Sequence, residues 1–256
     1  MKPKILAICS QKGGVGKTTT AINLAHGLAM NGKSVLLIDL DPQGHCATSL
    51  GLSTEPGVFY LLTMGTTPHE SAFMQQYVRP TGRENLWLLP GDQTTNAAQT
   101  VLNAQDAPIS AIRTRLKAIQ SNDLLYIILD MAPSVGGIQE RALWAADFVL
   151  IPSSTEYLAT EGAHQIAQTL LYLQTKRDWP GTLLVVLPTL YHAHLREHRA
   201  AYADLKAGFG ERVFPPIHRA TVLSECPGEA QTIFEKAPTG RAAQEYQQLV
   251  DLILQF

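Results

Sequence analysis

A glycine-rich loop close to the amino end constrains the fold of this chain more than any other feature. The loop, Gln-Lys-Gly-Gly-Val-Gly-Lys-Thr at 11–18, follows the apolar run KILAIC at 4–9 and precedes a helical pattern that closes at Asn31-Gly32. A glycine just past the last periodic residue is a common helix end. The order strand, loop, helix is therefore predicted. The helical spacing i, i+3, i+4, i+7 is carried by Ala21, Leu24, Ala25 and Leu28.

This order of elements is what a phosphate-binding loop requires. Glycines let consecutive backbone N–H groups converge on an anion, and the helix amino end adds the positive end of its dipole. Lys17 is expected to reach the β- and γ-phosphates of a nucleotide, and the Thr18 hydroxyl to ligate Mg²⁺. A glycine-rich turn without a ligand is the alternative, and the run GKTTT in this context favours the phosphate loop. The nucleotide-binding residues predicted here are Lys12, Gly13, Gly14, Val15, Gly16, Lys17, Thr18 and Thr19.

Short apolar runs recur along the chain, with helical patterns between them. They lack the strict alternation of half-exposed strands, as expected for strands covered on both faces. Alternation of strand and helix implies right-handed crossovers, so the predicted fold is one α/β domain over 1–256, a mostly parallel sheet of about seven strands with helices on both faces. The segment from about 50 to 110 is the least regular. The remaining runs lie at 34–39, 86–90, 124–130, 148–152, 183–188 and 212–217.

Composition narrows the function. The chain has 256 residues, 45% of them hydrophobic, which suffices for one sizeable core. A formal net charge of −2 argues against a strongly basic nucleic-acid binder, although it leaves room for a local patch. The cysteines, Cys9, Cys46 and Cys226, form no C-x-x-C, which favours a reducing cytoplasm over a disulfide framework or a zinc ribbon.

The loop departs from the general pattern G-x-x-x-x-G-K-[ST], because Gln11 stands at its first position and Lys12 at its second. In this it resembles the deviant Walker A loop of the ParA/MinD family of ATPases, closest to the Soj-like ParA partition ATPases. The resemblance implies that Lys12 reaches across a dimer interface to the nucleotide of the other subunit. The alternative for Lys12 is a solvated loop lysine.

The resemblance continues in VLLIDLDPQGHCATSLG at 35–51, which is similar to the family motif D-x-D-P-Q-G-N at a strand end. It implies that Asp41 orients or activates the attacking water and that Asp39 lies nearer the metal. Strand ends are where ligands bind in doubly wound sheets. Capping of the loop through Asx turns is the alternative for both acids. His45 stands where the family has asparagine.

Two later stretches also resemble the family. YIILD at 126–130 looks like a Walker B strand, whose Asp130 would hold Mg²⁺ together with Thr18, through water. The stretch 215–246 is similar to the family's carboxyl-terminal region, which implies that the loop of Ile217, His218 and Arg219 covers the adenine. The implied cofactors are ATP and Mg²⁺.

The resemblance also implies partners. ATP would close a homodimer that binds a surface, with nucleoid DNA the favoured one, and a cargo adaptor or ParB-like activator would stimulate hydrolysis. Acidic neighbours leave a solvated helix as an equal alternative to a DNA patch. Three histidines within 191–198 could hold zinc, but a polar helix face is favoured. The candidate DNA contacts are Arg196, Arg199, Lys206 and Arg219.

Two other functions remain as alternatives. A MinD-like ATPase would bind a membrane surface through its last helix, but 242–256 carries an apolar face and no lysine or arginine, which favours core packing. No apolar run approaches the roughly 20 residues that span a bilayer, so a membrane partner is not expected. A metabolic ATP-dependent enzyme of the same superfamily is the second alternative. The expected location is the cytoplasm, in association with the nucleoid.

Overall fold

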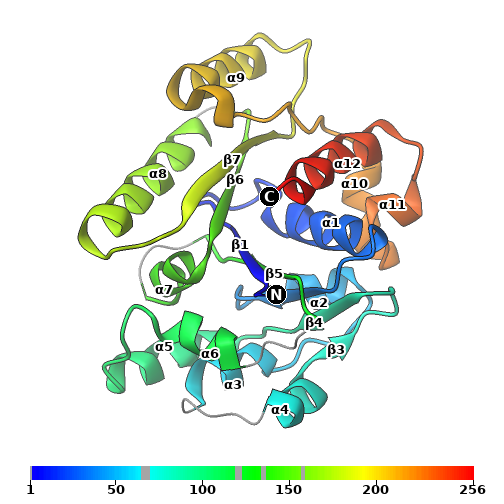
Figure 1. The fold of residues 1–256 in the computed structure, drawn as a ribbon. Helices are drawn as coiled ribbons and strands as arrows, with labels where there is room; N and C mark the ends of the chain where they lie inside the picture. The colour runs from blue at the N-terminus through cyan, green and yellow to red at the C-terminus, as the bar shows by residue number, and fades with distance from the viewer. Residues whose placement is uncertain (1, 65–69, 119–122, 134–136, 157–158) are drawn as a thin grey trace.

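A single twisted sheet organises the chain (Figure 1). The computed structural model describes residues 2–64, 70–118, 123–133, 137–156 and 159–256. Across this part of the chain the sheet has seven strands in the order β3-β4-β2-β5-β1-β6-β7. The strands are β1 (Lys4–Ile8), β2 (Val35–Asp39), β3 (Arg79–Pro80), β4 (Leu86–Leu89), β5 (Tyr126–Asp130), β6 (Phe148–Ser154) and β7 (Thr182–Thr189).

All neighbouring strands run parallel except β3, which pairs antiparallel with β4. The register places Asp130 beside Ile8 on one side and beside Asp39 on the other. The carboxyl ends of β1, β5 and β2 therefore meet at one edge, where the glycine-rich loop leaves β1. The mostly parallel sheet of about seven strands is confirmed, and six of the predicted runs form its strands.

The seventh predicted strand, at 212–217, is wrong. This segment follows the outer edge of β7 with isolated bridges only, from Val213 to Val186 and from His218 to Tyr191. Phe214 N and Ile217 N each donate to a carbonyl of β7, but Pro215 and Pro216 between them have no N–H to donate, so no ladder can form. The seventh strand is instead the two-residue β3, which is too short to show any periodicity.

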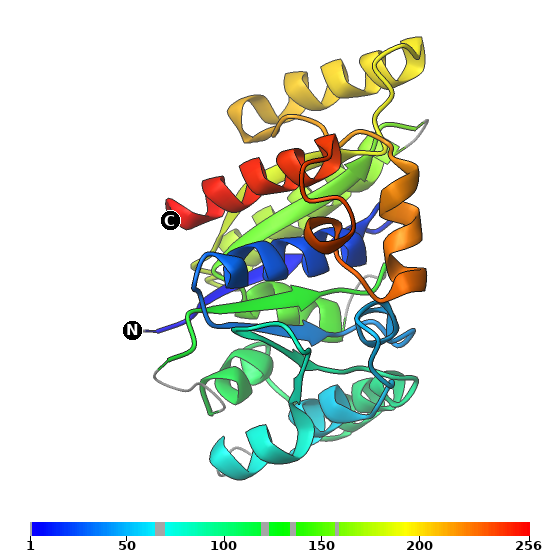
Figure 2. The ribbon, with the colours of Figure 1, turned by 90° about the vertical axis from the view of Figure 1, so that its right-hand side faces the viewer.

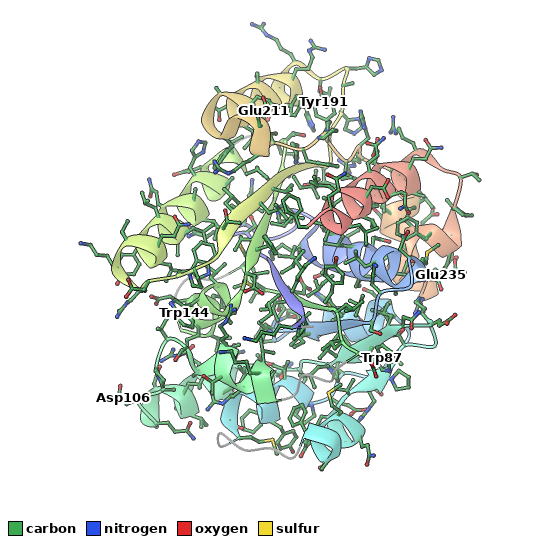
Figure 3. All side chains as sticks on the ribbon, viewed as in Figure 1. Trp87, Asp106, Trp144, Tyr191, Glu211 and Glu235 are labelled. Atoms are coloured by element: carbon green, nitrogen blue, oxygen red, sulfur yellow. The ribbon has the colours of Figure 1, made fainter. Side chains whose placement is uncertain are left out.

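Helices cover both faces of the sheet (Figures 1 and 2). Within each central strand alternate residues enter opposite cores: Ile5 and Ala7 pack on one side, Leu6 and Ile8 on the other. Figure 3 shows side chains filling both interfaces. The first core contains α3 (Gly57–Thr63), α4 (Glu70–Tyr77), α5 (Thr94–Ala104), α6 (Ala111–Ala118), α7 (Ile138–Ala145), α8 (Ala159–Lys176) and α9 (Arg196–Phe209), which runs into η1 (Gly210–Arg212). The second contains α1 (Lys17–Met30), α2 (His45–Ser49), α10 (Thr221–Glu225), η2 (Cys226–Glu229), α11 (Ile233–Lys236) and α12 (Arg241–Leu254).

The last helix, α12, packs against α1, as the core-packing interpretation predicts. Its inner face buries Tyr246, Leu249 and Val250, and the Tyr246 hydroxyl lies 3.3 Å from Thr20 Oγ1. A Cβ added at Gly27 of α1 would meet Val250 Cγ2 at 2.4 Å, so the two helices approach closely only because position 27 is glycine. Within the described residues, no helix has the length and apolarity needed to cross a membrane.

Candidate functional site

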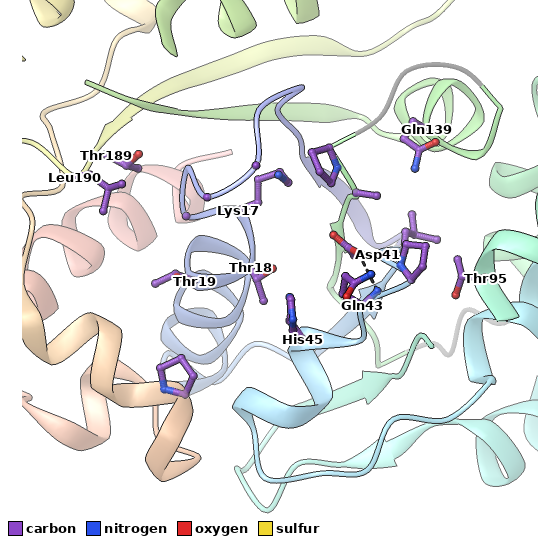
Figure 4. A pocket seen from close by; sticks show the side chains of 18 of the residues that line it. Lys17, Thr18, Thr19, Asp41, Gln43, His45, Thr95, Gln139, Thr189 and Leu190 are labelled. Carbon is purple, nitrogen blue, oxygen red and sulfur yellow. Dashed lines mark hydrogen bonds between the residues drawn. The ribbon is translucent and has the colours of Figure 1, made fainter. Parts of the chain in front are cut away.

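A cleft of about 1120 Å³ opens at the edge of the sheet where β1, β2 and β5 end. Figure 4 shows Lys17 and Thr18 at its centre, with Thr189 and Leu190 on one side and Thr95 and Gln139 on the other. Its lining joins the predicted phosphate loop, the Asp41 loop and the predicted adenine loop. The cleft thus brings together sequence segments that are up to 200 residues apart, as the parallel sheet requires.

The glycine-rich loop has the backbone that a phosphate cradle needs. Gly14 and Gly16 adopt φ of 71° and 82°, a left-handed conformation in which other residues are strained. Gly13 and Gly14 are exposed, and a Cβ placed on either would meet no atom of the described residues within 4 Å. The loop is also held from the side, because Thr189 Oγ1 donates to Val15 O at 2.8 Å. Thr189 was not predicted, although it directly follows the apolar run 183–188, where a strand-end ligand could be expected.

Lys17 is buried and donates from Nζ to the Lys12 carbonyl oxygen at 3.0 Å. Burial lowers the pKa of its ammonium group, while the carboxylates of Asp130 and Asp41 act in the opposite direction. A cation with so few partners is suited to an anionic ligand, whose charge would offset the cost of burial. Lys12 itself is half-buried in the same loop.

Thr18 and Asp130 form the junction between the loop and β5. Thr18 Oγ1 donates to Asp130 Oδ2 at 2.7 Å, and Cys46 Sγ lies 3.3 Å from the same oxygen. Asp130 Oδ1 is buried and has no hydrogen-bond partner in the part of the chain that the structure describes. Burial raises the pKa of Asp130 to about 6, although the bonds from Thr18 and Cys46 oppose this rise.

Asp39 lies beside Asp130 at the end of β2 and is also fully buried. Its Oδ2 accepts from Cys46 N at 2.9 Å and its Oδ1 from Asp41 N at 3.1 Å. Burial and the neighbouring Asp130 hold the pKa of Asp39 well above its usual range. Two buried carboxylates side by side are stabilised by a cation.

These residues fit a magnesium ion. The orphaned Asp130 oxygen and the Thr18 hydroxyl are hard oxygen ligands of the kind that Mg²⁺ takes beside substrate phosphates. Of the predicted metal ligands, Thr18 donates to Asp130, and Asp39 pairs with Asp130 in the strand register. Cys46, in contact with both acids, was not predicted, and its neighbours along the chain gave no signal of it.

Asp41 is half-buried in the cleft wall (Figure 4). Its Oδ1 accepts from Gln43 N at 2.9 Å, which is the Asx turn that the capping alternative predicts. The same carboxylate acts electrostatically on the Lys17 ammonium. Capping and a role in the cleft are thus compatible in one residue.

The far end of the cleft is lined by the predicted adenine loop, Ile217, His218 and Arg219. Glu245 of α12 fixes this loop, because its carboxylate accepts from His218 N at 2.9 Å and lies 2.7 Å from His218 Nδ1. Tyr191 packs edge-on against the His218 ring, with centroids 5.2 Å apart. Tyr191 and Glu245 were missed, because their proximity to position 218 comes only from the tertiary fold.

The opposite end of the cleft extends beyond Asp41 to α5. Thr95 and Gln99 line it, and the Thr95 hydroxyl is buried without a partner. Gln99 Oε1 accepts from Ile138 N at 2.5 Å and so ties α5 to the start of α7. Gly137 is needed there, since a Cβ would lie 1.8 Å from Gln99 Oε1. The sequence gave no indication of this extension.

The basic residues proposed for DNA lie apart from the cleft, except for Arg219. Arg196 and Arg199 are exposed on the first turn of α9. Lys206 lies in its last turn and donates to Val213 O at 2.8 Å. Within the described residues, the histidines of 191–198 form no group that could share a metal ion, because His194 precedes α9 and His198 is buried with Nδ1 2.7 Å from Thr155 Oγ1.

Comparison with known proteins agrees with this geometry. A family model described as an AAA domain matches residues 3–179. The chromosome-partitioning ATPase Soj of Thermus thermophilus is 37% identical over 254 residues, which cover 99% of this chain and 96% of Soj. The chain belongs to the ParA/MinD family of ATPases.

Solved structures extend the comparison within and beyond the ParA/MinD family. McdA of Cyanothece, in its apo form, superposes with a TM-score of 0.87 at 24% identity, covering 98% of this chain and 100% of McdA. Cobyrinic acid a,c-diamide synthase of Mycobacterium smegmatis, with bound ADP and magnesium, has a TM-score of 0.80 at 29% identity, covering 99% of this chain and 95% of the synthase. As a ParA/MinD ATPase, the chain is an ATP-hydrolysing P-loop enzyme.

Proposed function

We propose that this chain is an ATP-dependent switch that partitions or positions a cargo, as chromosome-partitioning relatives do by name. One observation carries the proposal: a glycine-rich loop with two lysines is joined through Thr18 to the buried carboxylate of Asp130, in a chain of the ParA/MinD family. The whole chain, 1–256, would act as one ATPase unit in the cytoplasm, on the nucleoid.

Each group in the cleft has a role in phosphoryl transfer. Lys17 and the backbone of Gly13–Thr19 bind the phosphates, and Thr18 with Asp130 and Asp39 hold Mg²⁺. The metal would neutralise charge that develops on the phosphate oxygens. Asp41, at the mouth of the cleft, orients the attacking water and accepts its proton. Ile217, His218 and Arg219 cover the base.

Dimerisation would complete the site. In this proposal, Lys12 of one subunit reaches the phosphates bound in the other. Its backbone carbonyl serves the Lys17 of its own subunit, so the side chain and the carbonyl of one residue act on different nucleotides. A cation supplied across an interface can accelerate phosphoryl transfer by roughly 10³-fold or more, as arginine fingers do. Hydrolysis would be slow until a partner orders the dimer.

The proposed surface is DNA, bound without sequence preference through Arg196, Arg199, Lys206 and Arg219. Three of these residues are exposed on α9. The activator is a cargo adaptor or a ParB-like protein. The balanced charge of the whole chain would make this binding weak per monomer and dependent on two copies of the patch in a dimer.

A second candidate function is an ATP-dependent synthetase. Two observations favour it: the cleft continues past Asp41 to Thr95 and Gln99, leaving room for a second substrate beside the phosphates, and the fold resembles a diamide synthase at 29% identity. Such an enzyme would turn over a small acid many times without a protein partner.

The two functions are separated by the oligomeric state during turnover. Sedimentation velocity with ATP, ADP or no nucleotide should show a dimer only with ATP and Mg²⁺, with slow phosphate release. A chain that stays monomeric with ATP while hydrolysing it would contradict the switch and favour the synthetase.

A further inference from the structure

One group of buried side chains near the cleft includes a cysteine sulfur, which phosphate binding does not require. Asp39, Cys46 and Asp130 lie close enough together to share a metal ion. Among the described residues, they are the one group of three or more histidine, cysteine, aspartate or glutamate side chains that does so. The potential ligand atoms of the three lie within 4.8 Å of one another. Sulfur is not expected as a ligand in a magnesium site, because Mg²⁺ binds oxygen ligands.

The spacing of the cysteine and Asp130, now joined by an S–H···O hydrogen bond, is compatible with two ligands of a softer cation. In a tetrahedral zinc site with a Zn–S bond of about 2.3 Å and a Zn–O bond of about 2.0 Å, sulfur and oxygen lie about 3.5 Å apart. Cys46 Sγ lies 3.3 Å from Asp130 Oδ2. The backbone holds this arrangement, because Cys46 N donates to Asp39 Oδ2 at 2.9 Å and so fixes the start of α2 against the end of β2.

The surroundings call for a cation. Asp130 Oδ1 is buried and has no hydrogen-bond partner among the described residues, although a buried charged oxygen is normally paired or bound to a metal. Asp39 and Cys46 are fully buried, and Asp130 is 1% exposed. Thr18, which donates to Asp130, and His45, which precedes Cys46 in the chain, both line the cleft.

We propose that Asp39, Cys46 and Asp130 form a binding site for a thiophilic divalent cation such as Zn²⁺ or Cd²⁺. On binding, the Cys46 S–H bond breaks, the sulfur–metal bond forms, and the proton leaves to solvent, with no change in oxidation state. The site shares Asp39 and Asp130 with the proposed magnesium site, so such a cation competes with Mg²⁺. It does not require ATP, and its test is therefore independent of the proposed switch.

Cadmium is the probe, because a cadmium–thiolate bond absorbs in the near ultraviolet by charge transfer. Metal-free, nucleotide-free protein is titrated with Cd²⁺ as wild type, Cys46→Ala, Cys46→Ser and Cys226→Ala. We expect one saturable band in the wild type and in Cys226→Ala, since Cys226 lies outside the cluster. Cys46→Ala and Cys46→Ser, which keeps a polar atom for Asp130, should both lose the band, and isothermal titration calorimetry should show that Cys46→Ser binds Cd²⁺ at least about 10-fold more weakly than the wild type.

Circular dichroism melting of the apo proteins shows whether each variant folds. Mg²⁺ in excess should displace Cd²⁺ from the wild type. A band that persists in Cys46→Ala, disappears in Cys226→Ala, or never saturates in the wild type would overturn the proposal. A folded Cys46→Ser variant with wild-type cadmium affinity would overturn it as well.

Discussion

Thr18 Oγ1 donates a 2.7 Å hydrogen bond to Asp130 Oδ2, and this bond joins the first turn of α1 to the end of β5. One residue earlier, Lys17 Nζ donates to the Lys12 carbonyl at 3.0 Å. Two side chains at the end of the loop therefore hold it in place, one bonded within the loop and one to β5, while Gly13 and Gly14 stay exposed. Such preorganisation lowers the entropy that a ligand must offset on binding.

Lys17→Ala should weaken nucleotide binding by at least about 10-fold. The substitution deletes the one buried ammonium group of the loop and a bond that closes it. Loss of a charged hydrogen-bond donor costs about 1.5–3 kcal/mol, or roughly 10- to 150-fold in affinity. Fluorescent ATP-analogue titration measures this, with Lys176→Ala on the exposed end of α8 as the matched control. ATP affinity near the wild-type value would contradict the loop assignment.

Asp41→Ala should bind ATP but not hydrolyse it. Asp41 lines the cleft, and its carboxylate caps the turn by accepting from Gln43 N. Loss of a general base lowers turnover by about 10²- to 10⁴-fold. We expect size-exclusion chromatography with ATP and Mg²⁺ to show a stable dimer. Asp251→Ala, on the exposed side of α12, is the control. Normal hydrolysis, or a variant that stays monomeric, would remove this role from Asp41.

Local sequence patterns were enough to predict the elements that carry the phosphate loop. The run 4–9, the glycines and the helical spacing to Asn31 correspond to β1, the loop and α1, because each is fixed by neighbours in the chain. The strand predicted at 212–217 was wrong because the prediction relied on the apolar residues of this run. Its two prolines cannot donate the hydrogen bonds of a strand ladder.

The rest of the site depends on contacts between distant residues. Thr189 reaches Val15 and Glu245 reaches His218 only after the sheet has formed. Cys46 enters the acidic cluster because the strand register places Asp39 beside Asp130. No periodicity or motif carries such information, so the predicted site contained the loop and its acids but not the residues that hold them.

DNA binding should require ATP and fall steeply with salt, because binding releases counterions from the phosphates. Arg196→Ala/Arg199→Ala should weaken it and reduce the slope of log affinity against log salt by about 0.9 per contact removed. Fluorescence anisotropy at several salt concentrations measures the slope. Lys117→Ala/Lys176→Ala removes the same charge from α6 and α8 and should leave the slope unchanged. If the ATP-bound protein does not bind DNA at about 50 mM salt, the proposal that DNA is the bound surface is contradicted.

His26 should make the protein less stable in acid. The ring is buried on α1, with Nδ1 2.7 Å from Thr232 Oγ1, and burial lowers its pKa below the usual 6.5, opposed by Glu235. The unfolded chain then binds a proton more readily than the native one. The stabilisation is therefore complete above the unfolded pKa and is lost as the pH falls through the folded pKa.

The His26→Gln variant tests this effect. It should melt below the wild type near pH 7.5, with a loss of about 0.5–1.5 kcal/mol for the hydrogen bond, and the gap should narrow towards about pH 5.5 as the wild type loses its advantage. His194→Gln, in the exposed turn before α9, should follow the wild type at every pH. A gap that is constant with pH would show that His26 does not titrate in this range.

Lys12→Ala should disrupt the ATP-dependent dimer and leave the fold of the single subunit intact. The contact that Lys12 makes with Lys17 comes from its backbone carbonyl, which alanine keeps. We therefore expect the bond that closes the loop to remain and ATP binding to be at least partly retained, and the melting temperature, measured alongside, shows whether the variant is folded. The ATP-dependent dimer and stimulated hydrolysis should be lost, because the phosphates of two nucleotides would face each other with less positive charge between them.

Mixing two inactive variants tests whether Lys12 acts across the interface. An Asp41→Ala subunit retains Lys12 but cannot activate water, and a Lys12→Ala subunit retains Asp41 but has no lysine to donate. In a mixed dimer, the site on the Lys12→Ala subunit combines its own Asp41 with the Lys12 of its neighbour, so hydrolysis should return in mixtures while each variant alone stays inactive. Differently tagged subunits show by co-purification whether mixed dimers form. Mixed dimers without activity would mean that Lys12 serves the nucleotide of its own subunit. In that case the site that retains Asp41 lies on the Lys12→Ala subunit, which has no lysine of its own to use.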